Sequence, residues 1–302
     1  MRKRHPILFM FLSLFGVAVF IFIVAYIATV GFGTRHWMPG EKIAIVRIEG
    51  VILDSNEIIE ELKEYRSSDS VKAILLRIDS PGGAVAPSQE IYQEVKKIRD
   101  EGKKKIVTSM GSVAASGGYY IASASDKIVA NPGSITGSIG VILELANISG
   151  LMKKVGVESV IVKSGKYKDI GSMFRSMTPE ERELIQGVID DTHDQFIEAV
   201  AEGRGMEKEK VILIADGRVF TGRQAQKLGL VDEIGNMQDA IKITAKLAGI
   251  KGKPDLLEKK KRFSIIDMIR NESVIGWITN GKTIPGLSGR EGSFRLQYLL
   301  AF

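Results

Sequence analysis

The chain has 302 residues, no cysteine, and a net charge of +6 from 42 Lys/Arg and 36 Asp/Glu residues. This length suffices for one core domain of roughly 200 residues with attached segments, and the lack of cysteine excludes disulfides, thiolate zinc sites and cysteine nucleophiles. The positive excess lies at the two ends, because residues 1–36 hold four basic and no acidic residues and residues 251–302 hold ten basic and five acidic ones. We therefore expect charge suited to a membrane surface and a tail, and no nucleic-acid partner.

An uncharged apolar run occupies residues 7–30 and follows three basic residues at positions 2–4. As a helix it would extend about 36 Å, enough to cross a lipid bilayer with some tilt. The alternatives are a cleaved signal peptide, for which Ala25, Ala28 and Gly31 supply small residues, and a buried soluble helix. The run is longer than the apolar core of a signal peptide, which has roughly 7–15 residues. Because basic residues favour the cytoplasmic side, we predict a single-pass anchor in the cell membrane, with a cytoplasmic N-terminus and the main domain outside.

Strand and helix patterns then alternate along the chain. Apolar, β-branched runs predict strands at residues 42–52, 71–78, 104–110, 127–133, 140–143 and 159–165. Amphipathic patterns predict helices at residues 55–68, 88–103 and 178–205, and a further helix that Ser116 opens. Ser55 is a plausible cap for the first of these helices. In the last of them, Thr178 is the predicted cap and Pro179 occupies the first helical position. The alternation predicts an α/β layered fold.

The patterns divide the chain into three segments. Residues 1–36 are the predicted cytoplasmic N-terminus and transmembrane anchor, and residues 37–250 are the main domain. Residues 251–302 form a basic, partly apolar tail in which the periodic patterns weaken, so that we expect it to be irregular.

Two glycine-containing turns follow predicted strands. In "VAASGGYYIASASD", Ser116 precedes Gly117 and Gly118 at the expected start of a helix, where backbone N–H groups have no partner within the helix. The serine is either a helix cap or a hydroxyl placed beside exposed amides. In "DSPGGAV", Gly83 is either part of an ordinary turn or the donor of an N–H group to a developing oxyanion.

A serine nucleophile requires a base, and few candidates exist. His5 and His36 flank the apolar run, and His193 lies in the long helix, where we interpret it as a packing or subunit-contact residue. A lysine can serve instead when burial lowers its pKa. "VKSGKYKDIGS" supplies Lys163, Lys166 and Lys168, among which the spacing alone does not choose.

Four segments together resemble the short, single-domain form of the signal peptide peptidase A family. They are "DSPGG", "SVAASGGYYIASASDKIVANPGSITGSIGV", "SGKYKDIGS" and "ADGRVFTGRQAQKLGLVDEIG", in that order. The resemblance covers roughly residues 41–250 together with the anchor. It implies the layered fold shared by Clp protease and the crotonases, with the peptidase domain at residues 37–250. It also implies a membrane-anchored serine endopeptidase that degrades remnant signal peptides and other membrane-derived or unfolded peptides.

The same resemblance implies roles for individual residues. Ser116 would be the nucleophile and Lys168 the general base, since Lys166 falls two residues early in the motif. Gly83 and Gly117 would form the oxyanion hole, and Ser138 in "TGSIG" would orient the lysine amine. No metal or cofactor is implied. The expected partners are peptide substrates, the lipid bilayer, and further copies of the chain in a ring whose subunits share catalytic residues.

Two other functions remain as alternatives. One is a crotonase-like acyl-CoA enzyme, which shares the fold and the oxyanion hole but has no serine nucleophile. The other is a catalytically silent membrane scaffold of the same fold. For the tail at residues 251–302 we hold two hypotheses, namely that it binds anionic lipid or that it occupies the substrate groove of the enzyme itself.

Overall fold

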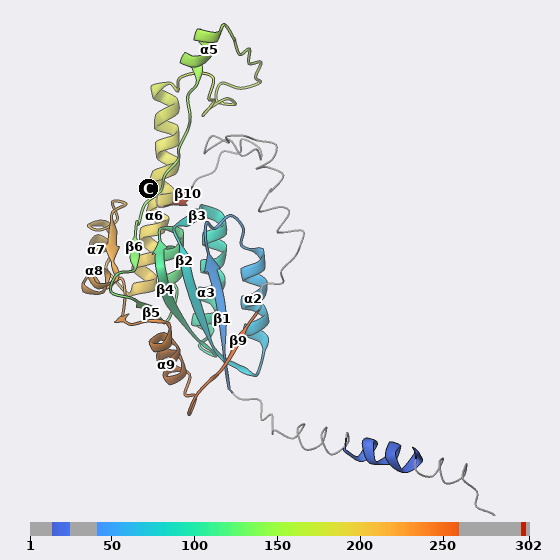
Figure 1. Ribbon diagram of the computed structural model, residues 1–302. Helices are drawn as coiled ribbons and strands as arrows, with labels where there is room; N and C mark the ends of the chain where they lie inside the picture. Colours follow the sequence, from blue (N-terminus) through green and yellow to red (C-terminus); the bar gives the residue numbers. More distant parts are fainter. Residues whose placement is uncertain (1–13, 25–40, 260–296, 300–302) are drawn as a thin grey trace, which may run out of the picture. The chain divides into compact units, whose positions relative to one another are not determined.

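The structure is a computed structural model that describes residues 14–24, 41–259 and 297–299. The chain divides into two units, Met1–Gly40 and Glu41–Phe302. All strands of the described residues belong to the second unit, which also carries every predicted site residue (Figure 1).

The first unit is described only in part. Residues 14–24 are helical and expose their apolar side chains. The remaining residues of the predicted anchor, 7–13 and 25–30, lie outside the described residues. In the ranges that are described, no helix combines the length and the apolar character required to cross a membrane.

The second unit is built on a mostly parallel sheet. Within the described residues it has eight strands, of which six run in the order β7-β6-β4-β2-β1-β9, while β5 pairs with β4 and β8 pairs with β5. Antiparallel pairing occurs only between β6 and β7 among the described pairs of this sheet. The strands are β1 (Lys42–Glu49), β2 (Val71–Ser80), β4 (Lys105–Ala115), β5 (Lys127–Ala130), β6 (Ile135–Gly137), β7 (Val219–Thr221), β8 (Glu233–Ile234) and β9 (Asp255–Glu258).

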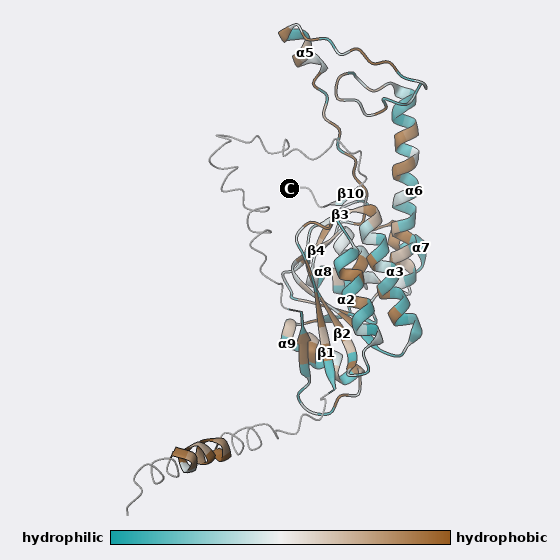
Figure 2. Ribbon diagram, turned by 90° about the vertical axis from the view of Figure 1, so that its right-hand side faces the viewer, coloured by the Kyte–Doolittle hydropathy of each residue, from teal (hydrophilic) through white to brown (hydrophobic). Residues whose placement is uncertain are grey.

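Helices cover both faces of this sheet, as the predicted α/β layering requires (Figures 1 and 2). Alternate residues of β1 point to opposite faces, so that Ala44 and Val46 join the larger core while Ile43 and Ile45 join the smaller core beneath α9. The helices are α2 (Asn56–Ser67), α3 (Val85–Glu101), α4 (Gly117–Ser123), α5 (Ser149–Val155), α6 (Pro179–Arg204), α7 (Lys208–Ile212), α8 (Gly222–Lys227) and α9 (Met237–Leu247).

Two predicted strands are wrong. Residues 159–165 have no regular secondary structure, and the segment 140–143 forms no extended strand. Val160 and Val162 are 84% and 95% exposed, so that their β-branched side chains pack against no second strand. The reason is that β propensity produces a strand only where a partner strand and a packing surface exist.

The C-terminal tail is more regular than its sequence pattern suggested. Asp255–Glu258 forms β9, which pairs in parallel with β1 at the edge of the main sheet. Gln297–Leu299 forms β10, which pairs antiparallel with β3 (Gly82–Ala84) in a second, two-stranded sheet. Both strands form because β1 and β3 have free edges with which they can pair. The local sequence of the tail does not show that these edges are near.

Helix α6 begins and ends where the sequence predicts. The Thr178 hydroxyl accepts the N–H of Glu181, whose carboxylate accepts the N–H of Thr178, and Pro179 occupies the first turn. The helix ends at Gly205, which has a φ of 60°. Its C-terminal half packs in the core through Phe196 and Val200.

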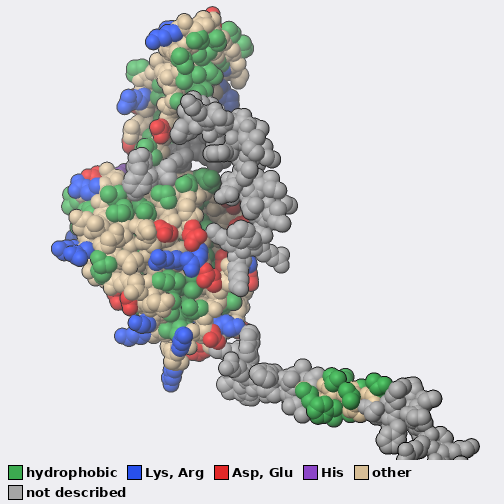
Figure 3. Space-filling model, in the orientation of Figure 1, with side chains coloured by type: hydrophobic (Ala, Val, Ile, Leu, Met, Phe, Trp, Pro, Cys, Tyr) green, Lys and Arg blue, Asp and Glu red, His purple; other side chains and the backbone are tan. Residues whose placement is uncertain are grey.

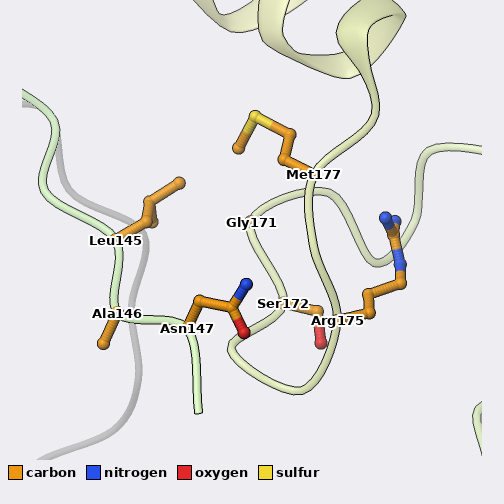
Figure 4. Close-up of a pocket in the computed structure, with 7 residues that line it drawn as sticks. All are labelled: Leu145, Ala146, Asn147, Gly171, Ser172, Arg175 and Met177. Carbon is orange, nitrogen blue, oxygen red and sulfur yellow. The ribbon is translucent and has the colours of Figure 1, made fainter. Parts of the chain in front are cut away.

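The N-terminal half of α6 extends out of the body together with residues 141–178, which include α5, and we call this part the projection (Figures 1 and 2). Hydrophobic side chains gather on it (Figure 3). Those that are exposed include Leu151, Val155, Val157, Val160, Val162, Met173, Phe174, Leu184 and Val188. A small cavity lies within the projection, where the side chains of Leu145 and Met177 lie above Asn147 (Figure 4).

Charged side chains hold the loops of the projection together. Arg175 donates hydrogen bonds to Asp169 at 2.7 Å and to Glu181 at 2.8 Å, and Lys163 also pairs with Asp169. Hydrogen bonds from Arg175 and then Lys163 hold the pKa of Asp169 well below its ordinary value. A hydrogen bond from Arg175 is the largest cause that lowers the pKa of Glu181, to about 2. The network therefore fixes the loop that contains Lys168 to the start of α6.

The contact between α6 and α4 allows a matched test of packing. A Cβ on Gly203 would lie 2.1 Å from the Ser123 carbonyl oxygen, whereas a Cβ on Gly187 in the same helix would meet no atom within 4 Å. We expect Gly203→Ala to lower the free energy of unfolding by about 2 kcal/mol or more. Gly187→Ala should leave it unchanged or raise it by up to about 1 kcal/mol through helix propensity. Denaturant unfolding followed by circular dichroism measures both, and equal effects would contradict the packing described.

The Arg175 network predicts a pH dependence of the projection. Carboxylates with a lowered pKa in the folded state stabilise it above their ordinary pKa of about 4, and this stabilisation is lost as the pH falls through the folded value. Backbone amide exchange in residues 164–177, corrected for the intrinsic effect of pH, should therefore stay slow above about pH 4 and accelerate toward pH 2. Arg175→Ala should accelerate exchange several-fold already at pH 7.

The exposed Arg182, which makes no ion pair within the described residues, provides the control for this measurement. Arg182→Ala should leave exchange in residues 164–177 unchanged. Equal protection in the Arg175 and Arg182 variants would show that the ion network does not hold the loop.

Candidate active site

Ser116 occupies the turn between β4 and α4 in a conformation that is rare for a side-chain-bearing residue. Its φ is 52° and its ψ is −118°. Its N–H donates to the Gly137 carbonyl at 2.8 Å, and its carbonyl accepts the N–H of Tyr120 at 2.8 Å. A non-glycine residue in such a conformation costs on the order of 1–3 kcal/mol and persists where the surroundings enforce it. Strand β6 on one side and the first turn of α4 on the other enforce it here.

The Ser116 hydroxyl is buried without a partner. The residue is 1% exposed, and its Oγ makes no hydrogen bond within the described chain. It also does not cap α4, because no side-chain bond to the helix amides is formed. The capping interpretation left open by the sequence is therefore wrong. A buried hydroxyl without a hydrogen bond is unfavourable and rare, which makes Ser116 a candidate functional residue.

The two predicted oxyanion glycines come together beside this serine. A Cβ built on Gly117 would lie 3.3 Å from both the Cα of Gly82 and the backbone N of Gly83. Gly82 and Ala84 are hydrogen-bonded to Ile52, whose N–H donates to Gly82 at 2.9 Å and whose carbonyl accepts from Ala84 at 2.7 Å. The intervening N–H of Gly83 takes no part in these two bonds. The backbones of two separate turns thus meet at the N-terminus of α4, where the first backbone N–H groups have no partner within the helix.

The paired glycines also serve packing, which the sequence did not suggest. A Cβ on Gly83 would lie 2.0 Å from the Ile52 carbonyl oxygen, and one on Gly117 would lie 2.6 Å from the Ser88 hydroxyl. One on Gly118 would lie 3.1 Å from the Ser80 carbonyl oxygen. Gly83 therefore has no room for a side chain beside the backbone of Ile52, and Gly118 lies in tight contact with the end of β2.

Asp79 has a positioning role that the sequence analysis missed. Between Ile78 and Ser80 the register of β2 against β4 shifts, so that Gly111–Val113 bulges opposite Asp79. The Asp79 carboxylate accepts the Val113 N–H at 3.0 Å and lies against Gly111, where a Cβ would be 2.5 Å from its Cγ. The bond sets the direction of the last residues of β4 before Ser116. The only signal in the sequence is an acidic residue directly after a buried strand.

Ser138 lies close to Ser116 in the fold. It directly follows Gly137, whose carbonyl binds the Ser116 N–H, and it too has a positive φ, of 51°. Its own N–H donates to Arg218 at 2.8 Å. The residue is nearly buried and lines a cavity of about 430 Å³. The other lining residues are Gly140, Val141, Ile142, Gln186, Ile189, Asp190, His193, Ala215, Asp216 and Gly217.

His193 shares this cavity with Ser138. Its Nε2 is buried without a hydrogen-bond partner among the described residues. Among the described residues no hydrogen bond joins His193 Nε2 to Ser116 or to Lys168. His5 and His36 lie outside the described residues.

The three candidate lysines are all on the projection, but their amines differ. Lys163 pairs with Asp169, and Lys166 pairs with Glu180, which raises the pKa of Lys166. Lys168 is exposed, and its amine makes no hydrogen bond or ion pair within the described part of the chain. Within one chain no hydrogen bond joins Lys168 to Ser116, whose Oγ has no partner among the described residues, and the projection extends away from the body that contains α4 (Figure 1).

The C-terminal strand β10 lies against the glycine turn of the site. Tyr298 stands opposite Gly83 in the antiparallel pairing with β3. A Cβ on Gly82 would lie 2.1 Å from the Tyr298 carbonyl oxygen and 2.8 Å from the N of Gly117. The chain's own C-terminal residues thus lie along the same turn that supplies Gly83. Among the described residues, no cluster of His, Asp and Glu side chains could hold a metal ion.

Comparison with known proteins assigns this arrangement to a family. The chain matches the peptidase family S49 over residues 98–251 and the Clp protease family over residues 42–134. It is 47% identical to a putative protease of Synechocystis, over 72% of this chain and 78% of that protein. It is 40% identical to a putative signal peptide peptidase SppA of Enterococcus faecium, over 67% of this chain and 62% of that protein.

A plant relative extends the aligned region. The chain is 32% identical to the chloroplastic serine protease SPPA of Arabidopsis thaliana over 82% of this chain, although the alignment spans only 38% of that longer protein. The Clp protease match agrees with the layered fold, and the S49 match extends from α3 to the end of the main domain. The chain therefore belongs to peptidase family S49 and is a serine peptidase.

Proposed function

We propose that the chain is a membrane-anchored endopeptidase in which Ser116 is the nucleophile and Lys168 the general base. Its substrates would be remnant signal peptides and other membrane-derived or unfolded peptides. The observation that carries the proposal is the buried, unpartnered hydroxyl of Ser116, held at positive φ beside the amides of Gly83 and Gly117. A crotonase-like enzyme requires no such serine, and membership of a peptidase family disfavours both the acyl-CoA enzyme and the silent scaffold.

The reaction would follow from these groups. The neutral amine of Lys168 accepts the Ser116 proton while Oγ attacks the carbonyl carbon of a peptide bond. The amides of Gly83 and Gly117 stabilise the negative charge that develops on the carbonyl oxygen. The C–N bond then breaks, the amine fragment leaves with a proton from the lysine, and an acyl-enzyme remains. Water, deprotonated by Lys168, hydrolyses this ester and restores the serine.

Lys168 is chosen over its neighbours because its amine alone among the three is without a partner in the described residues. Lys163 and Lys166 are each held in an ion pair with a carboxylate, so that either amine would have to leave its partner to reach a serine. A lysine amine becomes a usable base when it enters a dry site and loses its hydration. The cavity beside Ser138 offers such a place, where the Ser138 hydroxyl would orient the amine.

The proposed dyad joins two copies of the chain. Lys168 is exposed on the projection, whereas Ser116 is buried in the body, so that one copy does not complete the site. The projection exposes apolar side chains such as Val160, Val162 and Phe174. Such a surface is suited to contact with a neighbouring subunit. We propose that the projection of one subunit delivers Lys168 to Ser116 of the next, in a closed ring.

The membrane location is likewise a proposal. It is supported by the uncharged run at residues 7–30 and the basic residues at positions 2–4. An anchor there would keep the peptidase near the peptides that the membrane releases.

Substitution of the site residues tests the dyad. In casein or short-peptide cleavage by the detergent-solubilised full chain, Ser116→Ala and Lys168→Ala should each lower the rate by at least about 100-fold. Lys166→Ala removes a neighbouring amine of the same chemistry and should retain most of the activity. Loss of activity in Lys166→Ala with retention in Lys168→Ala would reverse the assignment of the base.

Mixed assemblies test whether the dyad is shared between subunits. Chains with Ser116→Ala are co-expressed with chains with Lys168→Ala in equal amounts. The mixed assemblies should recover about a quarter of the wild-type activity, because in about a quarter of the contacts an intact serine meets an intact lysine of the neighbouring subunit. Two inactive parents that stay inactive on mixing, in assemblies shown to contain both, would place the dyad within one chain.

Fractionation of cells that express the chain tests the anchor. The full chain should remain in the membrane fraction after an alkaline wash, and protease added outside spheroplasts should degrade the main domain. Removal of residues 1–36 should release the protein from the membrane fraction. A full chain recovered in the soluble fraction, or one protected from external protease, would contradict the proposed location or orientation.

A further inference from the structure

Lys168 lies in a loop of consecutive tight turns. Its N–H donates to the Gly165 carbonyl at 3.2 Å, and the N–H of Ser172 donates to the Asp169 carbonyl at 3.0 Å. The stem of Lys168 lies over the first of these turns, since a Cβ on Gly165 would be 3.6 Å from the Lys168 Cγ. Exposed loops held only by such backbone bonds are among the more mobile parts of proteins. The turns alone therefore do not fix the direction of a long side chain.

The amine of Lys163 bridges the two sides of this loop. It donates a hydrogen bond to the Lys166 carbonyl at 2.8 Å and also pairs with the Asp169 carboxylate. One of these partners precedes Lys168 in the sequence, and the other follows it directly. Lys163 thus ties together the residues on both sides of the proposed base, a connection that the backbone bonds of the turns do not make.

Asp169 joins this bridge to the start of α6. Its second carboxylate oxygen accepts a hydrogen bond from Arg175 Nε at 2.7 Å, and its carbonyl accepts one from Arg175 Nη2 at 3.3 Å. Arg175 in turn donates to Glu181 at 2.8 Å, in the first turn of α6. The side chains of Asp169 and Glu181 are only 10% and 4% exposed. Exposed ion pairs stabilise little, but carboxylates as buried as these depend on their cations.

We propose that Lys163 and Asp169 are positioning residues of the peptidase, which hold the loop so that the amine of Lys168 reaches the serine of the neighbouring subunit in the reacting geometry. The inference rests on the proposed function, because it takes Lys168 as the base. A displacement of about 1 Å at a reacting group can lower a rate by about 100-fold. A base that arrives from another subunit therefore needs a rigid support, and Lys163 provides it without taking part in proton transfer.

Removal of the Lys163 amine tests this support. In peptide cleavage by the detergent-solubilised full chain, Lys163→Met should lower kcat about ten- to 100-fold and change KM by less than about threefold. The reason is that the base is displaced while the groups that bind the peptide are unchanged. Asp169→Ala should have a similar effect. The two changes together should lower kcat little further, because both break the same bridge.

Lys166→Met is the matched control for these variants. The amine of Lys166 also forms an ion pair, with the exposed Glu180, but this pair lies on one side of Lys168 and does not bridge the loop. Since exposed pairs of this kind stabilise little, the Lys166→Met chain should retain most of the activity.

Arginine substitutions separate positioning from proton transfer. Arginine keeps the positive charge and the N–H donors of lysine but does not give up its proton in proteins. Lys163→Arg should therefore recover most of the activity that Lys163→Met loses, whereas Lys168→Arg should be inactive. A Lys163→Arg chain as inactive as Lys163→Met would overturn the positioning role. If the Lys168→Arg chain were active at the same time, the proposed function would fail as well, because Lys163 would then be the base.

Assembly and loop motion are measured on the same samples. Size-exclusion chromatography in detergent should give the same elution for wild type, Lys163→Met and Asp169→Ala, and circular dichroism should show that they fold. Amide exchange in residues 164–177 should be faster in these two variants and unchanged in Lys166→Met. If Lys163→Met does not fold, the Lys163→Arg and Asp169→Ala chains still decide.

Two results would overturn the positioning role and leave the proposed dyad intact. One is wild-type kcat in both Lys163→Met and Asp169→Ala. The other is loss of assembly together with activity in these variants, which would assign the two residues to subunit contact.

Discussion

The hydrogen bond from the Ser116 N–H to the Gly137 carbonyl is the contact on which the site depends. Together with the bond from Tyr120 to the Ser116 carbonyl, it holds a serine at positive φ between a strand and a helix. Without both bonds the residue would relax toward ordinary backbone angles, and its hydroxyl would leave the position in which it has no partner. The unfavourable conformation and the unsatisfied hydroxyl occur at the same residue, and the sheet and α4 stabilise both.

The surrounding glycines and Asp79 make this geometry compatible with close packing. The turn at Gly82 and Gly83 lies so close to the start of α4 that a Cβ on Gly117 would be only 3.3 Å from it. Asp79 compensates for the bulge in β4 by accepting the N–H of Val113. The result is a site at the carboxyl ends of the parallel strands β2 and β4, where open α/β sheets commonly bind their ligands.

The body and the projection divide the proposed chemistry. The body supplies the buried hydroxyl of Ser116 and the amides of Gly83 and Gly117. The projection carries Lys168 on loops that depend on ion pairs of Arg175 rather than on a core. Under the proposed dyad, an isolated subunit would lack a base near its serine, and assembly would be a condition for catalysis.

The sequence by itself determined the elements whose signals are local. The buried strands, the start of α6 at its capping box and the glycine turns before and after Ser116 all followed from periodicity and turn chemistry, because these act between near neighbours. The motif order also indicated the peptidase family. Only the tertiary structure decided the rest, since contacts between distant segments are not encoded locally. It left the β-branched run at 159–165 without a partner strand and placed the C-terminal residues beside β1 and β3. It likewise set the strained backbone angles of Ser116. It also showed that Lys163 and Lys166 form ion pairs whereas Lys168 forms none among the described residues. Each of these results depends on which distant groups the fold brings into contact.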